Sequence, residues 1–338
     1  MPRLPSFSIV LEWENARLAG AERASLMLRE LVSQARELSS EVTIRPELIL
    51  LYEKEEVPHD AVEQAVNAAC GSDAPFEVRY HATEGAGYYG QKNEGAQLAG
   101  REYLLFLDSD VVPEPGWLRA LVGSLGPGVN VVGGSTYVDT QTFFGRAFGL
   151  FWFFPVRTQA QGLKQVRYFY ANNVMFRRDL FLAYGFADLP LYRGQCKILA
   201  DGMRENGVRI FQQTGARVSH APPNPRHFVH RALSEGHDAV MLSKLAGRSG
   251  EVGRVELRNR LAHYRDRVNS RRPNFSVGRA ETVAAHALAR AYCLLRFAGQ
   301  RWAIRSPEGA QRALGIPTHP LPATIARPLR LQEARQQR

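Results

Sequence analysis

Two aspartates one residue apart, Asp108 and Asp110, follow an apolar run in the segment FLDSDVVPEPGWL (106–118). Carboxylate oxygens are the ligands that Mg²⁺ and Mn²⁺ prefer, and a cation held there binds phosphate oxygens in turn. Such a cation neutralises the charge that develops on a departing diphosphate. The alternative is a turn in which Asp108 caps the chain and Asp110 is solvated. The place of the pair in the fold decides between the two.

The elements before this pair alternate between strands and helices. Apolar runs rich in strand-forming residues predict buried strands at 7–13, 46–53, 76–81 and 102–108. Amphipathic patterns predict helices at 21–39 and 59–71, and the glycine-rich segment 85–100 leads into a further short helix. This order predicts an α/β fold with a mostly parallel sheet flanked by helices. Ligands bind outside the carboxyl ends of such strands, which is where Asp108 and Asp110 then lie.

Further strands are predicted at 128–138 and 168–178. The segment 197–220 reads as a helix that stops at Asn206-Gly207, followed by a strand that ends at His220. The aromatic segment FFGRAFGLFWFFPVR (143–157) is too short to span a bilayer. Two interpretations of it stay open: a buried core helix or lid, and a surface that faces lipid or an acceptor.

The charge of the chain changes near Pro225. Residues 1–225 carry a formal charge of −3, and residues 226–338 carry +13. We therefore predict a domain at 1–225 and a basic, mainly helical extension at 226–338. An anionic membrane surface is one expected partner of this extension, and a solvated basic face on packing helices is the alternative. From about Pro317 the chain is rich in proline and arginine, and we expect no regular structure there.

Composition and the N-terminal sequence indicate the cellular location of the protein and the partners to expect. Three widely spaced cysteines form neither a disulfide framework nor a zinc pattern, which is typical of a reducing cytoplasm. The N-terminus reaches Glu12 after a very short apolar run, so we expect no signal peptide. Basic and aromatic residues are not interleaved as in nucleic-acid-binding proteins, so no nucleic-acid partner is expected. We predict a cytoplasmic protein with the inner face of the membrane as a site of peripheral binding.

The segment FLDSDVVPEPGWL, with GQKNEGAQLAGREYLL before it and SIVLEWEN as the first strand, resembles the family 2 glycosyltransferases of the GT-A fold. The likeness runs from about Ser8 to His220. It implies a Rossmann-like sheet and metal-dependent transfer of a sugar from a nucleoside-diphosphate sugar. A UDP-sugar, Mn²⁺ or Mg²⁺, an inverting reaction and a glycan or lipid-linked acceptor are the expectations that follow from it.

The resemblance also implies roles for individual residues. The implied nucleotide-binding residues are Glu12, Glu14, Glu53, Lys92, Asn93, Asp108 and Ser109. The implied metal ligands are Asp110, Asp108 and His220. Structural alternatives stay open for Glu53 as a solvated charge, for Asn93 as a helix cap and for His220 as a packed histidine.

The family's catalytic base is an aspartate that opens the helix after the acceptor-side segment, and this sequence departs from that pattern. The position holds Cys196, preceded by Gln195, which cannot accept a proton. A thiol with a reference pKa near 8.5 is a poor general base. We predict Asp188 as a displaced base. Asp201 lies more than one helical turn past Cys196 and is expected to point elsewhere.

Three other functions stay open at this stage. A chain without a base could bind the donor without transferring the sugar. The basic extension could serve as a membrane- or partner-binding module. A nucleotidyltransferase would also use carboxylates and a metal, but it would show a basic glycine-rich stretch after the first strand, where this chain has EWENARLAG.

Overall fold

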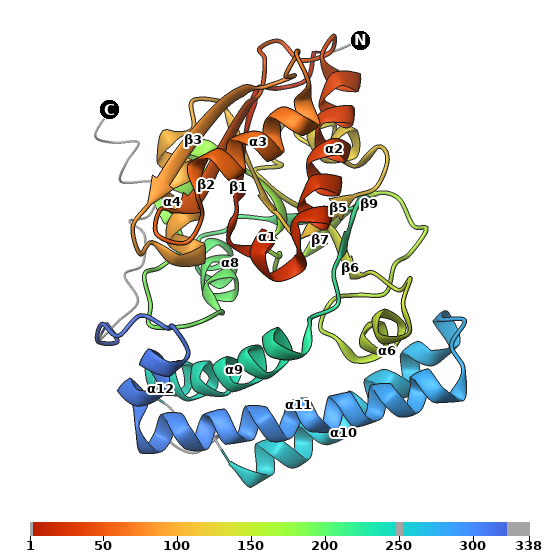
Figure 1. The fold of residues 1–338 in the computed structure, drawn as a ribbon, viewed down its shortest axis with the longest axis vertical. Helices are drawn as coiled ribbons and strands as arrows, with labels where there is room; N and C mark the ends of the chain where they lie inside the picture. Colours follow the sequence, from red (N-terminus) through yellow and green to blue (C-terminus); the bar gives the residue numbers. More distant parts are fainter. Residues whose placement is uncertain (1–2, 248–252, 323–338) are drawn as a thin grey trace.

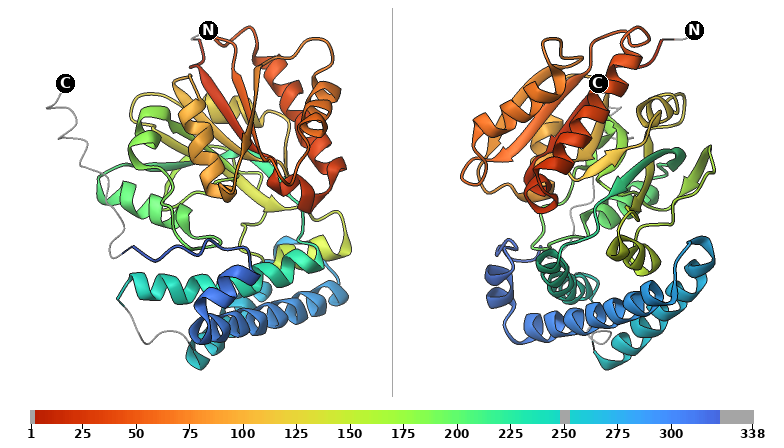
Figure 2. Two further views of the ribbon diagram at one scale, coloured as in Figure 1. Left: turned by 60° about the vertical axis from the view of Figure 1, so that its left-hand side comes forward. Right: turned by 45° about the vertical axis from the view of Figure 1, so that its right-hand side comes forward.

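A computed structural model describes residues 3–247 and 253–322. A curled sheet with flanking helices forms one layer, and long C-terminal helices form a second layer beside it (Figure 1). The turned views of Figure 2 show the same two layers. Part of the region after Pro317, in which no regular structure was expected, lies outside the described residues.

The first half of the sheet is parallel and follows the predicted order. Its strands are β1 (Phe7–Glu12), β2 (Glu47–Glu53), β3 (Glu77–Thr83) and β4 (Tyr103–Asp108). The connecting helices are α1 (Glu14–Ala19), α2 (Ala21–Leu38), α3 (His59–Cys70) and α4 (Gly87–Leu98). Because Glu12 pairs with Asp108, both carboxylates lie at the carboxyl end of the sheet. The predicted elements of this half are confirmed.

The second half of the sheet is mixed. It contains β5 (Val111–Pro113), β6 (Val131–Val138), β7 (Leu163–Val166), β8 (Asn173–Arg177) and β9 (Ile210–His220). The strand order is β3-β2-β1-β4-β8-β6-β9-β5, with β7 paired to β9. β8 runs antiparallel to β4 and β6, whereas β6 and β9 are parallel. The predicted α/β sheet is confirmed, but its parallel pairing is confined to the first half and the β6–β9 pair.

Shorter helices accompany this half. They are α5 (Trp117–Val122), α6 (Phe143–Phe151), α7 (Arg178–Tyr184) and α8 (Gln195–Glu205). The strand predicted at 168–178 begins only at Asn173. The aromatic segment forms α6 and the turn after it, and most of its rings, including Phe148, Phe151 and Trp152, are buried. This confirms the core-helix interpretation for these rings, although Phe144 is 61% exposed.

The strands are buried because both faces of the sheet are covered. Along β1, Phe7, Ile9 and Leu11 pack with α2 and α3, whereas Val10 packs with α4 and α7 on the other face. This alternation follows from the two-residue period of a strand. The two covered faces hold the strands in place, so the residues at their carboxyl ends have fixed positions.

The second layer begins at Pro225. It contains α9 (Pro225–Leu245), α10 (Arg254–Arg271), a 3₁₀ turn (Arg272–Asn274), α11 (Arg279–Arg305) and α12 (Pro307–Ala313). α9 and α11 approach closely at Gly236 and Gly299, where a Cβ on either residue would lie 2.1 Å from a carbonyl oxygen of the other helix. Among the described helices, none combines the length and the apolar composition that crossing a membrane requires. The division into two domains stays a prediction.

Candidate functional site

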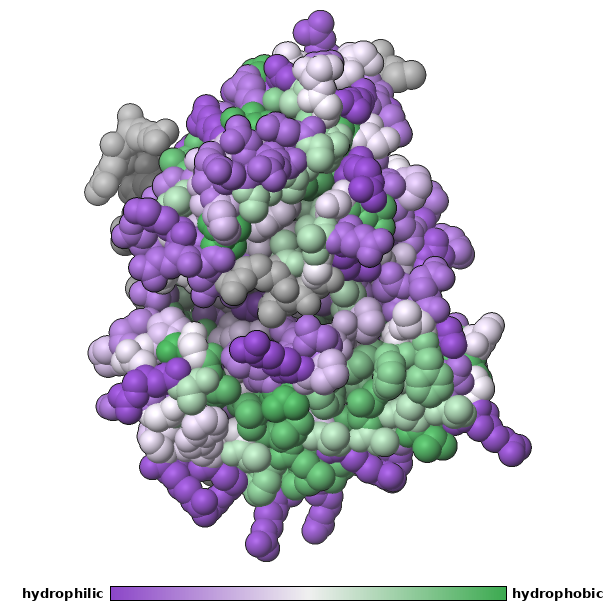
Figure 3. All heavy atoms as spheres, viewed as in Figure 1, coloured by the Kyte–Doolittle hydropathy of each residue, from purple (hydrophilic) through white to green (hydrophobic). Residues whose placement is uncertain are grey.

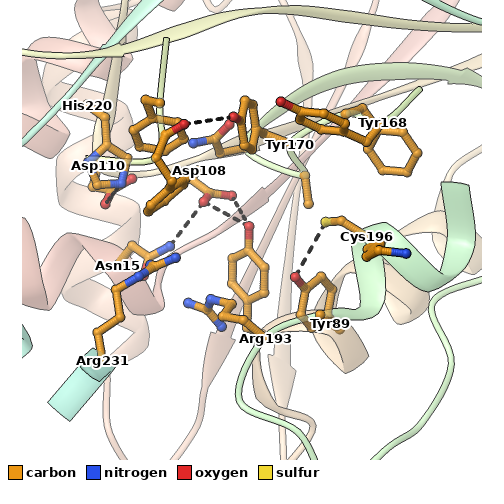
Figure 4. A pocket seen from close by; sticks show the side chains of 18 of the residues that line it. Asn15, Tyr89, Asp108, Asp110, Tyr168, Tyr170, Arg193, Cys196, His220 and Arg231 are labelled. Carbon is orange, nitrogen blue, oxygen red and sulfur yellow. Dashed lines mark hydrogen bonds and ion pairs between the residues drawn. The ribbon is translucent and has the colours of Figure 1, made fainter. Parts of the chain in front are cut away.

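A cavity of about 570 Å³ lies at the carboxyl ends of β1 and β4, and residues of both layers line it. Its aromatic lining residues are Tyr88, Tyr89, Phe153, Phe154, Tyr168, Phe169 and Tyr170. Its charged and titratable lining residues are Asp108, Asp110, Asp201, Arg167, Arg193, Lys197, Arg204, Arg231, His220, His227 and Cys196. Figure 4 shows several of these side chains around the cavity. The two aspartates of the sequence motif therefore lie in the large cavity, which supports the ligand-binding interpretation over a solvated turn.

Asp108 is held by three neighbouring side chains. Lys92 Nζ lies 2.7 Å from Oδ1, and Tyr88 Oη donates to Oδ2 at 2.9 Å. Asn15 donates to Oδ2 at 3.3 Å and to Glu12 at 2.7 Å. The lysine is fully buried, so its charge neutralises Asp108 in a poorly solvated place. Burial, and then the charge of Asp108, raise the pKa of Glu12 well above its usual value.

Asp110 faces His220 at the end of β9. Asp110 Oδ2 lies 3.1 Å from His220 Nε2. Burial alone would raise the pKa of Asp110, but the neighbouring His220 and Arg23 outweigh it and hold the pKa below its usual value. Asp110 Oδ1 is buried and has no hydrogen-bond partner among the described residues. This oxygen is thus an ionised, unpaired acceptor at the cavity.

These two side chains fit a divalent cation. His220 Nδ1 lies 2.6 Å from the carbonyl oxygen of Ala221, which only accepts, so Nδ1 carries the hydrogen. In the neutral ring Nε2 then presents a lone pair to the Asp110 carboxylate. Two acceptors at this separation repel each other unless a proton or a cation lies between them. A carboxylate with an imidazole oriented through its other nitrogen is a common metal-ligand arrangement.

Asp108 is held differently from Asp110. Within the part of the chain that the structure describes, no three histidine, cysteine, aspartate or glutamate side chains are placed to hold one metal ion. Asp108 accepts hydrogen bonds from Lys92 and Tyr88. The role of Asp108 as a second metal ligand stays a prediction.

Several residues implied by the resemblance lie outside the cavity lining. Glu53 accepts hydrogen bonds from the backbone N–H groups of Gly85 at 2.8 Å and Ala86 at 3.1 Å, so it caps the start of α4. Asn93 exchanges hydrogen bonds with the backbone of Phe186. Glu12, Glu14, Lys92 and Ser109 are not lining residues. Glu12, Lys92 and Ser109 are buried, and Lys92 is bound to the lining residue Asp108. Whether any of them contacts a nucleotide stays a prediction.

The structure changes which of the candidate catalytic bases lie at the cavity. Asp188 is 89% exposed, pairs with His319 at 3.1 Å and does not line the cavity, so the structure does not support it as the base. Burial raises the pKa of the Cys196 thiol, which is therefore protonated at neutral pH. Asp201 does line the cavity, contrary to the sequence expectation. Lys197, Asp201 and Arg204 recur at helical spacing, and this stripe of α8 faces the cavity.

Two residues that position the site were missed by sequence reasoning. Arg23 of α2 donates to the backbone carbonyls of Asp110 and Ser219, each at 2.7 Å, and so fixes the ends of β5 and β9. Glu114 accepts from Arg157, Arg217 and Tyr137, which lowers the pKa of Glu114 to about 2. The only signal for Glu114 was its position directly after the motif, between two prolines.

Comparison with known proteins finds a match to one family. Residues 58–185 match the sequence profile described as glycosyl transferase family 2, so this segment is similar to that family. A glucosyl-dolichyl phosphate glucuronosyltransferase from Haloferax volcanii is 27% identical to this chain over 180 residues, which are 51% of the chain and 55% of the relative. The chain thus spans about half the length of this relative.

Two solved structures are similar to this chain. GalNAc-T7, with UDP, GalNAc and Mn²⁺, is 12% identical over 90% of this chain and 58% of its own, with a TM-score of 0.52. A mannosyltransferase from Pyrobaculum calidifontis, with GDP-Man and Mn²⁺, is 16% identical over 93% of this chain and 79% of its own, with a TM-score of 0.49. The likeness to GalNAc-T7 agrees with a GT-A fold and says nothing of substrate.

Proposed function

We propose that this chain is a glycosyltransferase that moves a sugar from a nucleoside-diphosphate sugar to an acceptor hydroxyl, with a bound divalent cation. The observation that carries the proposal is the pair of Asp110 and His220, with an unpaired Asp110 oxygen, at the cavity. These residues would hold Mn²⁺ or Mg²⁺, which stabilises negative charge on a diphosphate when bound. The family match and the cavity support the same proposal.

Other side chains of the cavity are assigned further roles in donor binding and catalysis. Asp108 is held in one orientation by Lys92, Tyr88 and Asn15, and we assign it to the ribose or phosphates of the donor. The side chain has little freedom, so it can position a ligand without losing much entropy. The expected nucleobase of the donor is uracil, as the resemblance implies.

We propose Asp201 as the general base. It is the lining carboxylate that is bound neither by Lys92 nor by His220. Its ion-pair partners are Lys197 and Arg204 of the same helix, and Arg204 Nη1 lies 3.1 Å from Asp201 Oδ1. The acceptor oxygen attacks the anomeric carbon, the bond from that carbon to the phosphate oxygen breaks with its electron pair on the diphosphate, and Asp201 takes the hydroxyl proton. A single displacement of this kind inverts the anomeric centre.

The aromatic part of the cavity suggests the acceptor. Phe153, Phe154, Tyr168 and Tyr170 form a wall of neighbouring aromatic rings in the cavity lining. We propose a lipid-linked acceptor, presented at the inner face of an anionic membrane. The name of the Haloferax relative includes a dolichyl phosphate, which agrees with this choice.

Calorimetric titration tests the donor site. We expect UDP, or else GDP, to bind the wild-type protein with Mn²⁺ and much more weakly without it. Asp110→Asn should remove the metal-dependent part, because the amide is a weaker metal ligand than the carboxylate. Asp60→Asn, at an exposed position of α3, is the matched control and should bind as the wild type does. Absence of nucleotide binding with either metal would contradict the proposal.

A further inference from the structure

Three side chains reach the cavity from the loop before α8 and from the second layer. Arg193 precedes α8, and His227 and Arg231 lie in the first two turns of α9. Figure 4 shows Arg193 and Arg231 on one side of the cavity, near Asn15 and Asp108. The parallel sheet contributes neither arginine. We therefore ask which negatively charged group the two arginines face.

Arg193 forms no ion pair among the described residues, although the charge of Glu14 acts on it. Its guanidinium lies over the rings of Tyr88 at 4.0 Å and Tyr192 at 4.5 Å, and Nη1 donates to the Tyr192 carbonyl at 3.2 Å. No described carboxylate forms an ion pair with it. A guanidinium has five N–H donors, and leaving it enclosed without an anion is costly. The rings fix its position, so it is ready to accept an anion.

Arg231 and His227 lie in the same part of the cavity. Arg231 Nε donates to Glu235 at 3.2 Å, and its guanidinium lies 4.5 Å from the centre of the Phe153 ring. These contacts hold the side chain in place. Burial, and then the charges of Arg231 and Arg193, lower the pKa of His227 to about 3. His227 is therefore neutral, and the positive charge of the cluster comes from the two arginines.

The carboxylates around the cavity neutralise this cluster only in part. Asp108 is paired with Lys92 at 2.7 Å and Asp110 with His220 at 3.1 Å, whereas Glu235 pairs with Arg231 at 3.2 Å. Asp201 is paired with Lys197 and Arg204. Since Arg193 is in no ion pair among the described residues, a ligand with negative charge of its own suits this side of the cavity. Under the proposed function, that ligand carries a diphosphate beside Asp110, and a terminal phosphate matches the planar donors of arginine.

We propose that Arg193, Arg231 and His227 bind the terminal phosphate of the donor's diphosphate on the side away from Asp110 and His220. This inference rests on the proposed function. Since two of the three residues belong to α9, residues beyond 225 complete the donor site. The arginines also stabilise the negative charge that develops on this phosphate as the sugar leaves. The basic extension is then part of the catalytic unit and not an appended module.

Paired titrations test the cluster. Arg193→Gln and Arg231→Gln are compared with the wild type for UDP against UMP, and for inorganic pyrophosphate against phosphate, each with Mg²⁺. We expect each substitution to weaken UDP and pyrophosphate by about tenfold or more and to leave UMP nearly unchanged. Arg193→Lys, which keeps the charge, should recover part of the affinity. Arg260→Gln, in an ion pair of α10 outside the cavity, is the matched control and should change nothing.

Other outcomes overturn the inference. Unchanged binding of UDP and pyrophosphate by both variants would do so, as would an equal loss for UMP and UDP. Thermal unfolding of each variant separates a local change from a loss of the fold. If the wild type binds neither UDP nor GDP, the proposed function fails. The pyrophosphate comparison still decides the cluster in that case, since it needs no nucleoside.

Discussion

At the scale of residues, the two aspartates of the motif have different neighbours, and we therefore propose different roles for them. Asp108 ends β4 beside a buried lysine, whereas Asp110 lies one residue further, opposite His220. The sequence predicted that both lie at the cavity, since their position after a strand determines this. The sequence could not predict that Lys92 neutralises only one of the two aspartates, because this depends on the direction in which the Lys92 side chain leaves α4.

The catalytic base shows the same limit of prediction from sequence. The resemblance implies that Cys196 stands where the family has an aspartate, but which face of α8 meets the cavity depends on the packing of that helix. We expect Asp201→Asn to lower the rate of nucleoside-diphosphate release from the donor roughly 10²- to 10⁴-fold, with donor binding unchanged. Cys196→Ser should stay within a few-fold of the wild type, because the thiol is protonated. The opposite ranking in the same assay would exclude Asp201 as the base.

At the scale of elements, prediction succeeded where contacts are local in sequence. The strands and helices from β1 to β4 have clear periodic patterns and neighbours in chain order. β5 and β7 have only three and four residues and pair with β9, about a hundred and about fifty residues later in the chain. Segments this short carry almost no periodic signal. The antiparallel pairing of β8 between β4 and β6 likewise depends on long-range contacts.

The position of α9 depends on its close contact with α11. A Cβ at Gly299 would lie 2.1 Å from the Leu233 carbonyl oxygen, so Gly299→Ala should push the two helices apart. We expect a loss of about 1–3 kcal/mol in the free energy of unfolding, measured in urea, together with weaker UDP binding. Gly202→Ala in α8 has nothing within 4 Å of the new Cβ and is the control, with no loss expected. Equal stability of the two variants would argue against this packing role.

At the scale of the whole molecule, charge and apolar surface gather on the second layer. Figure 3 shows a broad hydrophobic area over the C-terminal helices and α6, with hydrophilic side chains projecting below it. Exposed apolar side chains of these elements include Phe144, Val283 and Leu294. A groove of about 430 Å³ between α10 and α11 combines Leu261 and Leu294 with Arg258, Arg265 and Arg290. This combination favours an anionic membrane surface.

Vesicle co-sedimentation tests this interpretation. The protein should bind vesicles that contain phosphatidylglycerol more strongly than vesicles of phosphatidylcholine alone, and salt should weaken the binding. Arg258→Glu with Arg290→Glu should reduce the binding several-fold, since each basic residue near the surface contributes about 1 kcal/mol. Arg29→Glu with Lys164→Glu, two exposed cations of α2 and β7, changes the net charge equally and should have little effect. Binding that ignores lipid charge would leave the alternative of a solvated basic face.

The central claim is that Asp110 and His220 hold the cation of the donor site. The most direct measurement is anomalous diffraction from a crystal grown with Mn²⁺ and the nucleoside diphosphate that titration identifies. We predict a single strong peak in bonding contact with an Asp110 carboxylate oxygen and His220 Nε2, with the diphosphate between the metal and Arg193. A peak bound to Asp108 in place of Asp110, or ordered nucleotide with no metal at His220, would contradict the account.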